Sequence, residues 1–219
     1  MKYLASAAAA LALAACGNAQ TESTARTEVL QAQASGTTAE AVFAGGCFWC
    51  VESDFEKVPG VIEAVSGYTG GTTDNPTYKE VTYSETGHYE AVKVIYDPAR
   101  VSYEELVDYF FRTIDPTDAR GQFCDKGSSY RTAVFATPEQ MAAAKAELDE
   151  VKATKPFKAP IVTPVLKAQT FYDAEDYHQD YYKTNAVKYK FYRQGCGRDA
   201  RLEKLWGDDA GVFKAAGES

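Results

Sequence analysis

The stretch of residues 41–50 constrains the fold of this 219-residue chain more than any other part of it. It begins with four apolar residues that have the composition of a short buried strand. Gly45 and Gly46 follow and permit a tight turn with a close backbone approach. The next residues, 47–58, have a helical pattern that ends before a Pro-Gly pair. The sequence therefore predicts that Cys47 lies where a strand turns into a helix.

The position of Cys47 predicts a reactive thiol. The first backbone N–H groups of a helix stabilise a negative charge, so a cysteine beside them has a lowered thiol pKa and a larger thiolate fraction. Phe48 and Trp49 come directly after it and supply an apolar, aromatic wall. The alternative is a core cysteine that is simply buried. We expect Cys47 to be a nucleophile for a substrate with a small apolar end.

Length and charge limit the class of protein. The chain has 45% hydrophobic residues, enough for one domain with a sizeable core. Its formal net charge is -8, which is unfavourable for binding nucleic acid. We expect a monomer that binds no nucleic acid.

The first residues have the pattern of a bacterial lipoprotein signal. Residues 1–15 begin with Met and one Lys and continue in a small and apolar run from Leu4 to Ala15, which is too short to span a bilayer. The run ends at Cys16, in a context that resembles a lipobox, and Cys16 is the expected lipidation site; ordinary cleavage beside a stray cysteine is the alternative. Residues 16–39 have a flexible tether's composition, and residues 40–219 form the predicted domain. We expect the protein to be lipid-anchored on the periplasmic side of a bacterial membrane.

The folded part mixes strand and helix patterns. Strand patterns cover residues 61–65, 88–97, 130–136 and 161–171, the last an edge strand or a bulge because it contains Pro164. Helices are predicted after the Ser102 and Thr137 capping boxes. This order lacks regular βαβ alternation and indicates an α+β fold. We expect a two-layer α/β sandwich whose sheet is mixed but mainly antiparallel, with a ferredoxin-like core.

Four cysteines belong to the folded part: Cys47, Cys50, Cys124 and Cys196. They are compatible with two structural disulfides, a zinc site or redox chemistry. A domain with this much core does not require disulfides for stability, which weakens the interpretation as two structural disulfides. Zinc would need two ligands besides the Cys-x-x-Cys pair, and no second paired motif supplies them, so we expect no metal. Cys196 lies between two glycines in what we expect to be a flexible loop.

Glu90 is the candidate acid. It alternates with Tyr89 along the strand pattern of residues 88–97, which has apolar residues on both faces and is therefore expected to be central in the sheet. A carboxyl group turned into an apolar interior has a raised pKa and can serve as a general acid. The alternative is that the Glu90 side chain lies on a strand face that contacts solvent and has no catalytic role.

Many ordered blocks of the sequence resemble the A-type peptide-methionine sulfoxide reductases, over about residues 40–207. These blocks are, in order, Gly46-Cys47-Phe48-Trp49, Pro59-Gly60-Val61, residues 66–71, Asn75-Pro76-Thr77-Tyr78, Thr86-Gly87-His88, Glu90-Ala91-Val92, Asp115-Pro116-Thr117, Gln122-Phe123-Cys124-Asp125, Tyr130-Arg131 and residues 174–179.

The resemblance implies thiol-dependent reduction of the S epimer of methionine sulfoxide, free or in proteins, as repair of oxidative damage. It implies that Cys47 attacks the sulfoxide sulfur, that Glu90 protonates the oxygen, and that a sulfenic acid forms on Cys47. The same resemblance assigns further roles: the hydroxyls of Tyr78 and Tyr130 bind the oxygen, Asp125 supports the site, and Phe48 and Trp49 hold the substrate methyl group.

The sulfenic acid must be resolved by a second thiol, for which the resemblance leaves two candidates. Cys196 is slightly favoured, and Cys50 is expected to act directly or as a relay; Cys124 is expected to be a packing residue beside the site. No cofactor is expected, because the electrons would come from thioredoxin or a thioredoxin-like protein. Two rival functions are a cysteine-based structural or binding lipoprotein and a general dithiol isomerase.

Overall fold

The computed structural model describes residues 38–215. The predicted signal segment, the lipidation site Cys16 and nearly all of the predicted tether lie outside these residues. β1 begins at Ala39, close to the expected start of the domain at residue 40. None of the helices in the described range is long and apolar enough to cross a membrane.

A six-stranded mixed sheet forms the centre of the fold, with the strand order β7-β6-β1-β3-β2-β8. Every neighbouring pair is antiparallel except β6 and β7. The expectation of a mixed, mainly antiparallel sheet is confirmed. The strands are β1 (Ala39–Gly45), β2 (Val61–Thr69), β3 (Tyr89–Tyr96), β6 (Thr132–Ala136), β7 (Val165–Lys167) and β8 (Tyr172–Asp173). A separate short hairpin is formed by β4 (Gly121–Gln122) and β5 (Asp125–Lys126).

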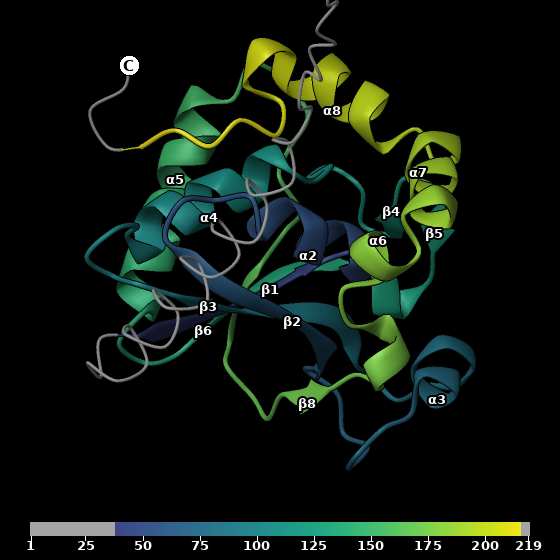
Figure 1. The fold of residues 1–219 in the computed structure, drawn as a ribbon. Coiled ribbons are helices and arrows are strands. Elements are labelled where there is room, and N and C mark those ends of the chain that lie inside the picture. The colour runs from purple at the N-terminus through teal and green to yellow at the C-terminus, as the bar shows by residue number, and fades with distance from the viewer. Residues whose placement is uncertain (1–37, 216–219) are drawn as a thin grey trace, which may run out of the picture. The chain divides into compact units, whose positions relative to one another are not determined.

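The helices complete a two-layer sandwich (Figure 1). α2 (Phe48–Phe55) connects β1 to β2, and α4 (Tyr103–Arg112) follows β3 and precedes β6. Together with α5 (Met141–Thr154), they pack on the sheet. The order β6-β1-β3-β2 with these two crossover helices is the ferredoxin-like arrangement, so this expectation is also confirmed.

The main core lies between the helices and the sheet. Phe43 of β1 stacks on Phe55 of α2 and on Phe110 of α4, with ring centroids 4.9 and 5.0 Å apart. Along β3, Val92 and Val94 are fully buried in this core, whereas Tyr89 packs against Phe135 in a second, smaller cluster. β3 lies between β1 and β2, which confirms its central place.

The Ser102 capping box forms as predicted, with reciprocal bonds between Ser102 and Glu105 at the start of α4. The reciprocal bonds between Thr137 and Gln140 also form, but α5 begins only at Met141. Thr77 and Glu80 form a further capping box, which was not predicted, at the start of α3 (Tyr78–Tyr83). β7 is an edge strand that begins after Pro164, as a proline without an N–H donor requires.

The end of the domain is helical, which corrects the expected loop around Cys196. α6 (Tyr181–Thr184), α7 (Ala186–Gly195) and α8 (Arg198–Trp206) follow one another, and Cys196 is the C-cap residue of α7. The loop prediction was wrong because α7 has few aliphatic residues. Short 3-10 turns complete the described structure at Ser128–Tyr130, Asp176–His178 and Gly207–Asp209.

Candidate active site

Cys47 is the N-cap residue of α2 and is separated from the end of β1 by Gly46 alone, so it lies at a strand-to-helix turn as the sequence predicts. The turn depends on Gly46, whose φ of 82° favours glycine. A Cβ atom at Gly46 would lie 2.5 Å from the Cβ atom of Gln122, so a side chain is also excluded by contact. These two constraints hold Cys47 at one place against strand β4, which contains Gln122.

A small cavity of about 70 Å³ opens beside Cys47. All seven residues that were predicted for catalysis and substrate binding line it, and one residue that was not predicted joins them. The lining residues are Cys47, Phe48, Trp49, Tyr78, Glu90, Asp125, Tyr130 and Tyr192. They come from α2, α3, β3, the β4–β5 hairpin, the 3-10 turn after it and α7, so segments far apart in sequence converge here.

Glu90 is buried on the same side of β3 as the valines of the main core. Burial raises the pKa of its carboxyl to about 8, and the negative charge of Asp125 adds to the effect. Hydrogen bonds from the Phe48 backbone N–H, at 3.0 Å, and from the Tyr130 hydroxyl oppose it. The prediction of a raised Glu90 pKa is confirmed. At neutral pH the carboxyl group holds its proton and can donate it.

The expectation of a lowered Cys47 pKa is wrong. Burial raises the pKa of the Cys47 thiol well above its usual value, and the neighbouring Cys50 and Glu90 raise it further. The first N–H of α2 belongs to Phe48 and donates to Glu90 instead of to Cys47. A hydrogen bond with the Tyr192 hydroxyl acts in the other direction and lowers the pKa of Cys47.

Cys50 lies one helical turn after Cys47 and is also buried. Its pKa is lowered, first by a hydrogen bond from the Cys47 thiol and then by the positive charges of Arg198 and Arg193. Arg198 is a buried cation that donates to the carbonyl oxygens of Gly45 and Thr113. Within the pair, the surroundings thus favour the thiolate form more at Cys50 than at Cys47.

Aromatic rings fix the wall that Phe48 and Trp49 form. The Trp49 indole stacks on Tyr181 at 3.7 Å between centroids and donates from Nε1 to Nδ1 of His178 at 3.1 Å. The Phe48 ring lies 4.9 Å from His178 and 6.3 Å from Tyr78. His178 thus supports both residues of the wall, a role that was not predicted.

The polar side of the cavity is a chain of hydroxyl and carboxyl groups. Tyr78 and Tyr130 hydrogen-bond to each other, and Tyr130 also bonds to Glu90. On the other side, the Tyr192 hydroxyl donates to Asp125 Oδ2. Burial raises the pKa of all three tyrosines, so their hydroxyls stay protonated. The arrangement offers several O–H donors to one acceptor atom placed in the cavity.

Tyr192 was missed in the sequence because the chain contains 15 tyrosines and no motif marks this one. The available signal is the spacing of Tyr189, Tyr192 and Arg193, which fall on one face of a helix. All three residues turn toward α2: Tyr189 and Arg193 influence Cys50, and Arg193 also forms a 2.8 Å ion pair with Asp54. This shared face can be recognised only when it is known that α7 is a helix.

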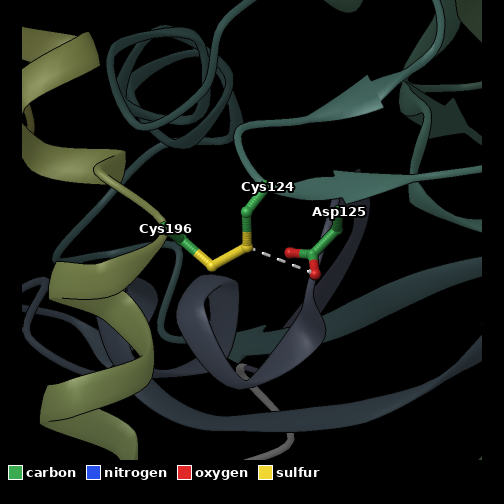
Figure 2. Close-up of side chains that lie close together, drawn as sticks. All are labelled: Cys124, Asp125 and Cys196. Carbon is green, nitrogen blue, oxygen red and sulfur yellow. Dashed lines mark hydrogen bonds between the residues drawn. A yellow bond between two sulfur atoms is a disulfide. The ribbon is translucent and has the colours of Figure 1, made fainter.

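A disulfide joins Cys124 to Cys196, and Cys47 and Cys50 are free thiols. The expectation that Cys124 is a packing residue is therefore wrong. Figure 2 shows the bond between the hairpin loop and the helical segment, with the Asp125 carboxyl beside it. Cys124 is exposed and Cys196 partly exposed. The two cysteines are 72 residues apart in the sequence, and no local pattern predicts their pairing.

Comparisons with known proteins agree with this geometry. The family model described as peptide methionine sulfoxide reductase matches residues 39–210. Peptide methionine sulfoxide reductase MsrA 2 of Rhizobium meliloti is 58% identical over 170 residues, which cover 78% of this chain and 84% of the relative.

The protein of the same name from Caulobacter vibrioides is 55% identical over 177 residues, covering 80% and 89% of the two chains. Among solved structures, methionine sulfoxide reductase A of Corynebacterium diphtheriae has a TM-score of 0.64 at 34% identity, covering 69% of this chain and 76% of that one. The chain belongs to the peptide methionine sulfoxide reductase family, in its A type.

Proposed function

We propose that this protein reduces the S epimer of methionine sulfoxide, free or in proteins, with Cys47 as nucleophile and Glu90 as acid. The observation that carries these two roles is that the two side chains line one small buried cavity. A sulfoxide sulfur is a poor electrophile until its oxygen is protonated, so the nucleophile and the acid must act on one molecule at once. The preference for the S epimer comes from the family.

The buried charges suggest where each proton goes. Glu90 is neutral at pH 7 and transfers its proton to the sulfoxide oxygen. Cys47 releases its thiol proton to the hydrogen-bonded Cys50 as its sulfur attacks. Methionine then leaves, and the oxygen stays on Cys47 as a sulfenic acid. The oxygen passes from the substrate to Cys47, so the substrate sulfur is reduced and Cys47 is oxidised.

The remaining residues of the cavity position the substrate. Tyr78 and Tyr130 donate hydrogen bonds to the sulfoxide oxygen from the polar side. The S-methyl group packs against Phe48 and Trp49, whose rings are fixed by His178 and Tyr181. Asp125 accepts a hydrogen bond from the Tyr192 hydroxyl and so holds the Tyr192 side chain in the wall of the cavity. A cavity of about 70 Å³ admits only a small apolar end, which suits a methyl sulfoxide.

Cys50 is the resolving thiol best placed for the first step. It hydrogen-bonds to Cys47, whereas Cys196, which the sequence slightly favoured, is bonded to Cys124. Cys50 attacks the Cys47 sulfenic acid, and the products are a Cys47–Cys50 disulfide and water. A thioredoxin-like dithiol protein supplies the electrons for the next cycle, and no prosthetic cofactor takes part.

The decisive experiment uses the pre-reduced protein with each epimer of methionine sulfoxide in a peptide. Chromatography should detect methionine formed from the S epimer only, and none with Cys47→Ser. A dithiol isomerase would instead reshuffle the disulfides of a scrambled protein substrate without forming methionine. A purely structural lipoprotein would do neither, and either outcome would overturn the proposal.

The anchoring predicted from residues 1–16 is part of the proposal. We place the enzyme on the periplasmic side of a bacterial membrane, held through acyl chains on Cys16 and joined to the domain by the tether of residues 16–39. The supporting observation is the lipobox-like end of the apolar run. Growth on radiolabelled palmitate should label the protein, and Cys16→Ser should abolish the label. Labelling that persists in the variant would contradict lipidation at Cys16.

A further inference from the structure

We infer that Glu52 is a positioning residue that holds residues 176–181 against α2 and so limits the size of the alkyl group that the wall of Phe48 and Trp49 admits on the substrate sulfur. The inference rests on the proposed function, in which this wall packs against the S-methyl group. Glu52 does not line the cavity and acts on the substrate only through Trp49. The observations that carry it are the burial of Glu52, its hydrogen-bond partners, and the contacts that residues 176–181 make with Trp49.

Glu52 leaves α2 on the same side as Trp49. The two residues are three positions apart in the helix, so their side chains are neighbours on its surface. Glu52 is only 1% exposed, and a glutamate is buried to this extent only when its carboxyl group has partners inside the protein. Those partners therefore show which parts of the chain Glu52 holds together.

Each oxygen of the Glu52 carboxyl group has a partner from a different part of the chain. Oε1 accepts a hydrogen bond from the backbone N–H of Asp180 at 2.5 Å, and Oε2 accepts one from the Ser66 hydroxyl of β2. Ser66 in turn exchanges two backbone hydrogen bonds, both of 3.0 Å, with the side-chain amide of Gln179. Helix α2, strand β2 and residues 179–180 are thus joined at one buried carboxyl group.

The backbone of Asp180 has a conformation that needs such a partner. Its φ of 52° lies in the left-handed region, which is unfavourable for a residue with a side chain. Asp180 is the N-cap residue of α6, and Tyr181 is the first residue of that helix. The hydrogen bond to Glu52 therefore fixes the point at which the chain turns into α6, and with it the position of the Tyr181 ring.

The residues on either side of this point support the Trp49 ring. His178 accepts the hydrogen bond from the indole Nε1 atom, and Tyr181 stacks on the indole with 3.7 Å between the ring centroids. Residues 179–180, which Glu52 and its partner Ser66 hold, lie between them in the chain. Removing the carboxyl group of Glu52 should therefore release both supports of the Trp49 ring together.

The chain before residue 176 has separate support. The Glu175 carboxylate accepts hydrogen bonds from the Tyr68 hydroxyl and from the backbone N–H of Tyr78, each at 2.9 Å. Strand β8 pairs with β2 just before it. Loss of the Glu52 contacts should thus loosen the later residues and leave the sheet and the position of Tyr78 unchanged.

A loosened Trp49 ring should change which substrates fit. The cavity has a volume of only about 70 Å³. In a tight apolar pocket, one additional methylene group lowers kcat/KM by about 10- to 200-fold. A wall that yields packs less well on a methyl group and excludes an ethyl group less strictly. The ratio of kcat/KM for a methionine sulfoxide peptide to that for the ethionine sulfoxide peptide therefore measures how firmly the wall is held.

Two substitutions of Glu52 separate hydrogen bonding from packing. Glu52→Met keeps the length and volume of the side chain but removes both carboxyl oxygens. Glu52→Gln keeps an oxygen for the Asp180 N–H, and its amide can donate to the Ser66 hydroxyl oxygen. The pKa of Glu52 is raised by burial to about 7, so glutamine resembles a form that the wild type already populates. Glu63→Met is the matched control, since Glu63 is an exposed glutamate of β2.

The test measures kcat/KM for both peptides by chromatography, with dithiothreitol as reductant. In Glu52→Met the ratio should fall about fivefold or more, whereas Glu52→Gln and Glu63→Met should keep the wild-type ratio. A lower fraction of folded protein reduces both values equally, so an unchanged ratio in Glu52→Met would overturn the inference whatever the remaining activity. If Glu52→Met does not fold, Ser66→Ala removes one partner only and should lower the ratio by about threefold. An unchanged ratio there would likewise overturn it.

Fluorine NMR of protein labelled with fluorotryptophan tests whether the effect passes through Trp49. The chain has two tryptophans, and Trp206 is buried in the main core, away from this contact. In Glu52→Met the Trp49 signal should shift or broaden, and the Trp206 signal should stay in place. A Trp49 signal that does not change would overturn the inference, as would a wild type that reduces both peptides equally well. Absence of methionine in the wild type would instead overturn the proposed function itself.

Discussion

The two cysteine pairs of this enzyme belong to opposite environments. Cys47 and Cys50 are free and buried at the start of α2, between a neutral glutamate and a buried arginine. Cys124 and Cys196 are bonded to each other at the surface, where the hairpin meets the junction of α7 and α8. The difference teaches that burial sets the protonation states of the groups that act on the substrate. Exposure sets which cysteine sulfur a partner protein can reach. The predictions below test whether the division is real.

The largest effect should come from the buried pair. Cys47→Ser replaces the attacking thiol by a hydroxyl, and methionine formation should fall by about 10⁴-fold or more. The single-turnover rate measured by chromatography checks this prediction, with circular dichroism as a control for folding. Residual activity within tenfold of the wild type would show that the nucleophile is another residue. It would also contradict the assignment of the chemical step to the buried cysteine pair.

Glu90→Gln should have the next largest effect. The amide keeps the shape of the side chain but cannot deliver a proton, so the single-turnover rate at pH 7 should fall by about 10²- to 10⁴-fold. Glu85→Gln is the matched control, since Glu85 is an exposed glutamate five residues earlier in the chain. If both variants react at the wild-type rate, Glu90 is not the acid.

The same carboxyl group should make stability depend on pH. Its pKa is about 8 in the folded protein against an ordinary 4.5, so the folded state binds more protons than the unfolded state between these values. The free energy of unfolding should therefore fall as pH rises through this window, by up to about 1.4 kcal/mol for each pH unit. Urea titrations at pH 5 to 8.5 should show a shallower fall in Glu90→Gln. Equal slopes in the two proteins would contradict a protonated buried Glu90.

Of these variants, Tyr192→Phe should have the smallest effect. It tests whether the Tyr192 hydroxyl acts on the thiol of Cys47. The variant loses the hydroxyl that stabilises the Cys47 thiolate, so the pKa of Cys47 should rise further. Alkylation of Cys47 by iodoacetamide at pH 8, measured in a Cys50→Ser background, should slow by about three- to tenfold, as expected for one hydrogen bond. An unchanged alkylation rate would show that Tyr192 only supports Asp125.

Local patterns explain why much of the site was predictable. The turn at Gly46 needs glycine, the N-cap follows from the strand and helix patterns, and alternation along β3 turns Glu90 toward the core. The capping box at Ser102 is likewise short-range and forms as the sequence predicts.

Long-range contacts explain the errors. The Cys47 pKa depends on Cys50, Glu90 and depth of burial, and the helix start that was expected to lower it instead donates its first N–H to Glu90. The Cys124–Cys196 pairing spans 72 residues, and α7, which ends beside Cys196, contacts α2 through the ion pair of Arg193 with Asp54. Local sequence patterns predict neither the surroundings of the Cys47 thiol nor the Cys124–Cys196 pairing.

The most direct test of the account is the protonation state of Glu90. Infrared difference spectroscopy between pH 6 and 9 should show a protonated carboxyl band that disappears with a midpoint near pH 8, and this band should be absent in Glu90→Gln. Glu52, whose pKa is about 7, remains in both proteins and cancels in the comparison. A Glu90 carboxyl group already ionised at pH 6 would contradict the central claim, because no proton would then be available for the sulfoxide oxygen at neutral pH.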